Sequence, residues 1–230
     1  MRTPIAGLLI ALAATEATAG AWPRPKGETF VSLATRQSTG ARTLIAAVQD
    51  IRSYNSIYVE HGLTDRLTVG LDAGQGRGPD EQVAAGLVFA RLPIWSPGDH
   101  KVAADLGFGL LEDGVDGVQT RVRSGLSWGR GFESRWGGGW LGMEASYEYR
   151  VPSGDSAVKA DFTAGLKPTD RWMTILQLQT GAYPDSDPIA RLAPSVVRRI
   201  GPRTHLQAGG LAPLAGDDAW GATLALWFTF

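Results

Sequence analysis

The chain has 230 residues and a formal net charge of −1, with 22 Lys and Arg against 23 Asp and Glu. This balance gives no basic footprint for a polyanion, so the composition predicts no nucleic-acid binding. The absence of cysteine excludes disulfides and thiolate metal sites. Thirty glycines and eight tryptophans favour a β-rich chain over a helical one.

Residues 1–21 have the organisation of a secretory signal peptide. Arg2 precedes an apolar run from Ile5 to Ala14, and small residues follow it. We expect cleavage after Ala19 or, alternatively, after Ala21, and export of the mature chain from the cytoplasm.

The remainder, residues 22–230, is predicted to be one domain. It holds no apolar run of the roughly 18 residues that a membrane-spanning helix needs. Instead, it shows period-two alternation in segments of about ten residues, the length of a tilted strand that crosses a hydrocarbon layer. Twelve such segments can be placed, at 28–36, 53–63, 66–74, 82–92, 101–111, 117–128, 139–150, 157–166, 172–181, 189–200, 204–212 and 219–230.

The alternation is clearest in the stretch from Lys101 to Leu110, where the even-numbered residues are apolar and the odd-numbered ones from Ala103 to Gly109 are small or acidic. The last eleven residues, 220–230, alternate in the same way and end on the aromatic Phe230. A soluble sandwich would alternate similarly, but with its polar face outside. Pro194 interrupts the tenth segment and is expected to remove one ladder hydrogen bond.

These patterns predict an all-β fold, a twelve-stranded antiparallel up-and-down transmembrane β-barrel with N- and C-termini on the periplasmic side. An even strand number places both termini at one end. Aromatic residues then form two girdles. The periplasmic one would hold Trp95, Trp128, Trp136, Trp140, Trp172, Trp227 and Phe230, and the other one Tyr54, Tyr58, Tyr147, Tyr149, Tyr183 and Trp220.

The same topology sorts the charges. The outer connections are acidic, with Asp50, Asp80, Glu81, Glu112, Asp113, Asp116, Asp155, Asp185, Asp187, Asp217 and Asp218. Ten charged residues are candidates to line a pore: Glu60, Asp72, Asp105, Arg121, Arg123, Glu144, Glu148, Lys159, Asp161 and Arg191. Such a face can pair into a plug or line an aqueous path. Interior glycines that would leave space, at positions 70, 86, 107, 109, 125, 142 and 165, favour a narrow pore.

With its signal peptide, alternating segments and terminal Phe230, the chain resembles Gram-negative outer-membrane β-barrels. This resemblance implies contact with outer-membrane lipid and lipopolysaccharide, and recognition of Phe230 by the barrel-assembly machinery. The stretch from Tyr58 to Leu71, a hairpin around a Thr-Asp turn, together with residues 22–27, is similar to the phenol-degradation meta-pathway group of barrels. That group is thought to move small hydrophobic or aromatic compounds.

We therefore expect a passive channel or transporter for small solutes with an acidic extracellular mouth. The alternative is a closed structural or lipopolysaccharide-interacting barrel. A lipid-modifying enzyme would need a His base near a Ser or an activated water. His61, His100 and His205 are scattered, so we expect no catalytic site, no cofactor and no metal site.

Overall fold

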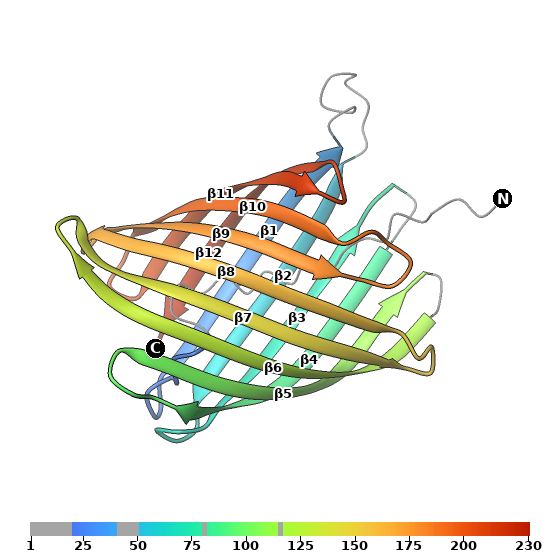
Figure 1. The fold of residues 1–230 in the computed structure, drawn as a ribbon. Helices are drawn as coiled ribbons and strands as arrows, with labels where there is room; N and C mark the ends of the chain where they lie inside the picture. The colour runs from blue at the N-terminus through green and yellow to red at the C-terminus, as the bar shows by residue number, and fades with distance from the viewer. Residues whose placement is uncertain (1–19, 41–50, 80–81, 115–116) are drawn as a thin grey trace.

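The computed structural model describes residues 20–40, 51–79, 82–114 and 117–230, so nearly all of the predicted signal peptide lies outside the described residues. The described chain forms a closed barrel in which each strand pairs antiparallel with its neighbours in sequence, and β1 pairs with β12 (Figure 1). The predicted all-β, twelve-stranded up-and-down barrel is confirmed. Both Thr29 and Phe230 lie at one end of the barrel, which we call the termini end.

Each predicted segment corresponds to one strand. The strands are β1 (Thr29–Gly40), β2 (Arg52–Gly62), β3 (Thr68–Arg77), β4 (Gln82–Trp95), β5 (His100–Asp113), β6 (Gly117–Ser134), β7 (Gly137–Val151), β8 (Ser156–Thr169), β9 (Trp172–Ala182), β10 (Ile189–Arg199), β11 (Thr204–Ala215) and β12 (Ala219–Thr229).

The apolar face of the alternation points outward. Leu106 is 62% exposed and Phe108 is 58% exposed on the outer wall of β5, whereas the side chain of the preceding residue, Asp105, is 8% exposed. Successive residues of a strand point to opposite faces, so the polar set of each strand turns inward. This orientation excludes the soluble sandwich, in which the apolar face would form the core.

The hairpin of β6 and β7 extends past the predicted strand ends. The connection expected at residues 129–138 is wrong, because Ser134 pairs with Gly137 and only Arg135 and Trp136 form the turn. Gly137 closes this turn with a φ of +113°, a backbone conformation that residues with a side chain rarely adopt. The hairpin therefore projects at the termini end with Trp136 at its tip.

Pro194 disturbs the wall as expected. In the pairing of β10 with β11, Leu192 lies opposite Ala212 and Ser195 lies opposite Gly209. Ala193 and Pro194, between them, have no Cα partner in β11. Proline has no N–H to donate to the ladder. The pairing of β10 with β9 continues without interruption through the same residues.

Candidate functional site: the barrel interior

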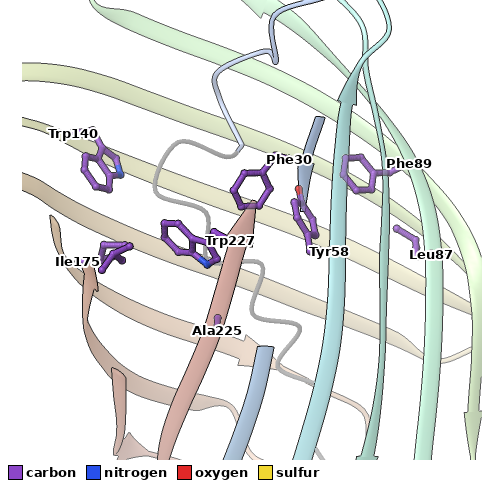
Figure 2. Close-up of a cluster of buried hydrophobic side chains, with 9 residues drawn as sticks. Phe30, Tyr58, Leu87, Phe89, Trp140, Ile175, Ala225 and Trp227 are labelled. Atoms are coloured by element: carbon purple, nitrogen blue, oxygen red, sulfur yellow. The ribbon is translucent and has the colours of Figure 1, made fainter. Parts of the chain in front are cut away.

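The interior near the termini end holds a cluster of large apolar side chains. It comprises Phe30, Tyr58, Leu87, Phe89, Trp140, Ile175, Val197, Ala225 and Trp227, which project inward from strands around the barrel (Figure 2). Tyr58 stacks on Phe89 at 5.8 Å between ring centroids, and Phe30 meets Trp227 edge-on at 6.1 Å. This half of the interior is packed with side chains.

Three of these aromatic residues correct the predicted girdles. Trp140, Trp227 and Tyr58 are each buried inside the barrel, not at an outer membrane boundary. Each has the sequence parity of the inward face of its strand, and parity determines the side on which a residue lies. Other members of the predicted girdles, such as Trp172 and Trp220, are exposed on the outer wall.

Most interior glycines accommodate large neighbours and do not leave open space, contrary to the expectation from sequence. Phe89 covers Gly70, Leu87 covers Gly107, and Trp140 covers Gly165 so closely that an added Cβ would overlap it. Gly86 was assigned to the wrong face, because the buried residues of β4 are the odd-numbered ones. These glycines allow neighbouring side chains to lie flat on the wall.

Residues 20–28, here called the lead segment, cross the interior at the termini end. Trp22 contacts the wall at Gly129 of β6, whereas the Arg24 amide donates a hydrogen bond to Thr68 Oγ1 of β3 at 3.0 Å. Gly27 N donates to Gly62 O of β2 at 2.7 Å. The lead segment thus runs from one side of the barrel to the other.

Near its start, the lead segment approaches a charged wall. Gly20 lies against the carboxylate of Glu144 in β7, with an added Cβ only 2.5 Å from Oε1. Ala21 is 1% exposed and Arg24 is 8% exposed. The segment is therefore packed inside the barrel.

Glu60 fastens the lead segment to the wall. Its side chain is 0% exposed and accepts from Arg24 Nε at 2.6 Å, from Tyr58 Oη at 2.6 Å, and from Arg91 Nη1. Arg91 lies near the end of the predicted segment 82–92, but β4 continues to Trp95 and the Arg91 side chain is buried inside the barrel. A buried carboxylate between two guanidinium groups is compensated in charge, as buried ions must be.

A second group of charges occupies the middle of the interior. Arg123 of β6 reaches Asp72 of β3 at 3.4 Å and Asp105 of β5 at 3.8 Å. Glu148 of β7 bridges Arg121 of β6 at 2.9 Å and Arg150 of its own strand at 3.1 Å. These contacts form a continuous polar strip on the inner wall of β5 to β7.

The strip continues onto β8, and a further ion pair lies at the opposite end of the barrel. Lys159 Nζ lies 2.7 Å from Asp161 Oδ2 on β8, and Arg191 Nε donates to Asp217 Oδ2 at 2.6 Å. Tyr183, in the connection after β9, faces the same region, and burial raises the pKa of its hydroxyl. Asp217 was expected in an acidic outer rim, yet it binds an interior arginine.

All ten predicted pore-lining residues have inward parity, and none is exposed. The structure joins most of them through the ion pairs above, and Glu144 lies directly opposite Asp161. Arg24 and Arg91 were missed as partners of Glu60. The pore-lining role of the ten predicted residues stays a prediction.

The three histidines occupy separate positions. His61 Nδ1 lies 2.9 Å from Thr29 Oγ1, Trp128 donates to His100 at 3.1 Å, and His205 packs on Trp227. Among the described residues, no group of three His, Cys, Asp or Glu side chains has the arrangement of a metal site. The described part of the chain also contains no helix long and apolar enough to cross a membrane.

Comparisons with solved structures place the fold among outer-membrane barrels. The chain is similar to the COG4313 outer membrane channel from Pseudomonas putida F1, with a TM-score of 0.64, 11% identity, and coverage of 92% of this chain and 98% of that one. It is also similar to the NanC porin, with a TM-score of 0.59, 11% identity, and coverage of 86% of this chain and 98% of that one.

A third similar structure is the KdgM porin in complex with disordered oligogalacturonate, with a TM-score of 0.58, 6% identity, and coverage of 86% of this chain and 99% of that one. No family model matches the chain, and no curated protein matches it. The resemblance to Gram-negative outer-membrane β-barrels is thus confirmed as a likeness of fold. The finer similarity to the phenol-degradation group stays a prediction.

Proposed function

We propose that the protein is a passive outer-membrane channel for small solutes. The observation that carries this proposal is the charged inner wall of β5 to β8. Charged groups inside a barrel provide a hydrated path that an apolar wall does not. The fold, shared with channels and porins, supports the same conclusion.

The finer parts of the proposal concern orientation and selectivity. The termini end would face the periplasm, and the opposite end would carry the acidic mouth with Asp155, Asp185, Asp187 and Asp218. Asp50, Asp80, Glu81 and Asp116 belong to the same expected mouth but lie outside the described residues. An acidic mouth raises the local cation concentration, and salt screens this effect.

We expect the lead segment to lower the conductance of the barrel. It lies across the interior at the termini end, where Trp22 packs against the apolar cluster. We therefore expect small conductance steps for the mature protein and larger ones for a variant lacking residues 21–26. Heat-modifiable migration on gels reports whether both barrels are folded.

Planar-bilayer recordings test the proposal. The expected result is a cation preference in low salt that weakens in high salt, and larger steps for the deletion variant. Equal steps for the two proteins would refute the obstruction by the lead segment, and an anion preference would refute the acidic mouth. If both proteins are folded and neither conducts, the channel function is wrong.

A second candidate is a closed structural or lipopolysaccharide-interacting barrel. It is favoured by the aromatic cluster and the lead segment, which together fill the termini half of the interior, and by the ion pairs among the interior charges, which suit a plug. We propose no catalysis for either candidate, because the three histidines lie apart and have structural partners. Folded but non-conducting protein in the recordings above would select this second candidate.

A further inference from the structure

The outer wall of the barrel carries a groove of about 810 Å³ near the termini end. It spans β8 to β11 and reaches the projecting β6–β7 hairpin. Its lining includes Phe132 and Trp136 of the hairpin, together with Leu166, Leu176 and Val196 of the wall. It opens on the apolar outer surface and not on the interior.

The groove is hollow because its floor has small outward-facing residues. Ala164, Thr174, Ala208 and Gly210 lie on neighbouring strands where larger residues would fill the space. Pro194, also in the lining, lies where the β10–β11 ladder is interrupted. The hollow is therefore built by the sequence of several strands together.

The hairpin supplies one side of the groove. Residues 137–139 of β7 are glycines, so the ring of Phe132 lies across the bare backbone at Gly139 and extends toward Gly165. Trp136 at the tip is 61% exposed and faces the same hollow. The groove thus has a long, apolar and partly aromatic boundary.

A positive charge stands at the termini-end edge of the groove. Arg198 follows Val196 on the outward face of β10 and lies opposite Trp172 of β9 and Leu206 of β11. Its guanidinium is 5.3 Å from the centre of the Trp172 ring, and both side chains are exposed. An arginine held on an aromatic face keeps N–H donors free for an anionic oxygen.

We propose that this groove binds one phospholipid, with an acyl chain along the apolar floor and the phosphate on Arg198. Guanidinium forms charge-assisted, frequently bidentate hydrogen bonds to phosphate. The groove lies in the apolar outer wall that would contact lipid, so a lipid is the partner whose chemistry suits both the hollow and the charge at its edge. The inference is independent of whether the barrel conducts.

Native mass spectrometry of detergent-purified protein tests the site. The protein is titrated with a diacyl phosphatidylglycerol or with a diacylglycerol of the same chains. Arg198→Gln removes the charge, and its matched control is Arg66→Gln, an exposed arginine in the β2–β3 turn. Ala208→Phe fills the groove, and its control is Ala90→Phe, an exposed outward alanine on β4.

We expect Arg198→Gln to weaken binding of the first phosphatidylglycerol about fivefold, the effect of one basic residue at a lipid surface. Ala208→Phe should abolish that first binding event. Diacylglycerol, which has no phosphate, should bind the unmodified protein as weakly as phosphatidylglycerol binds the Arg198→Gln variant, or more weakly. The controls should bind like the unmodified protein. Equal effects of each variant and its control would show only nonspecific lipid around the barrel and would overturn the proposal.

Discussion

Replacement of Glu60 by Gln tests the buried charge cluster that joins the lead segment to the wall. The substitution keeps the shape of the side chain but leaves Arg24 and Arg91 without their shared counter-charge. Glu60 is 0% exposed, and both arginines are nearly as buried. Removing one partner of a buried ion pair costs about 3–5 kcal/mol, and we expect the lower end because Gln still accepts a hydrogen bond.

Urea unfolding in lipid vesicles, followed by tryptophan fluorescence, measures this loss. With an m-value of about 1–3 kcal/mol/M, a loss of about 3 kcal/mol lowers the unfolding midpoint by roughly 1–3 M. The control is Glu133→Gln on the exposed β6–β7 hairpin, which should change stability by less than about 0.5 kcal/mol.

A double-mutant cycle with Arg91→Gln separates the pair from general damage. Because the two side chains share one contact, the double variant should be more stable than the sum of the single losses predicts, by about 1–3 kcal/mol. A loss below about 1 kcal/mol for Glu60→Gln, or strict additivity in the cycle, would refute the assignment of a desolvated cluster at this end.

Two further predictions concern the packed interior. Gly165→Ala should destabilise the barrel by about 1–3 kcal/mol in the same urea assay, because its methyl group would overlap an interior tryptophan. Gly142→Ala, whose added Cβ meets nothing closer than 3.8 Å, should leave the midpoint nearly unchanged, and equal losses would contradict this reasoning. Intact-mass measurement of protein purified from membranes should show cleavage after Ala19, because the new amino group of Gly20 would then lie beside the interior Glu144 carboxylate and compensate its charge. A mature chain that starts two residues later would contradict it.

The strand order and the orientation of most side chains could be predicted from the sequence. In β5, the even-numbered residues from Val102 to Leu110 are apolar and the odd-numbered ones between them are small or acidic, so one face had to turn outward. The ten interior charges follow from the same parity. Local periodicity was sufficient here because a two-residue repeat specifies a face without knowledge of the neighbouring strands.

The interior packing could not be predicted in the same way. Both faces of β4 are apolar, with Leu87 and Phe89 inside and Val88 and Leu92 outside, so its parity was undetermined. Gly86 was placed on the wrong side for that reason. Periodicity also gives no information on contacts that cross the barrel.

The missed partners of Glu60 illustrate this limit. Arg24 lies 36 residues away from it in sequence and Arg91 lies 31 residues away. The assumed strand length of about ten residues ended β4 at Leu92 and left Arg91 near a turn. Arg91 shares the parity of Leu87 and Phe89, so it turns inward with them once β4 continues beyond it.

The seam between β1 and β12 has a consequence for assembly. It pairs Phe30 with Thr229, at nearly opposite extremes of the described chain, and continues to Gly40 opposite Ala219. Until β12 is in place, β1 and β11 present two open edges whose N–H and C=O groups can recruit other chains. Pairings this distant in sequence form slowly, so the incomplete sheet must be shielded from aggregation until β12 pairs with β1.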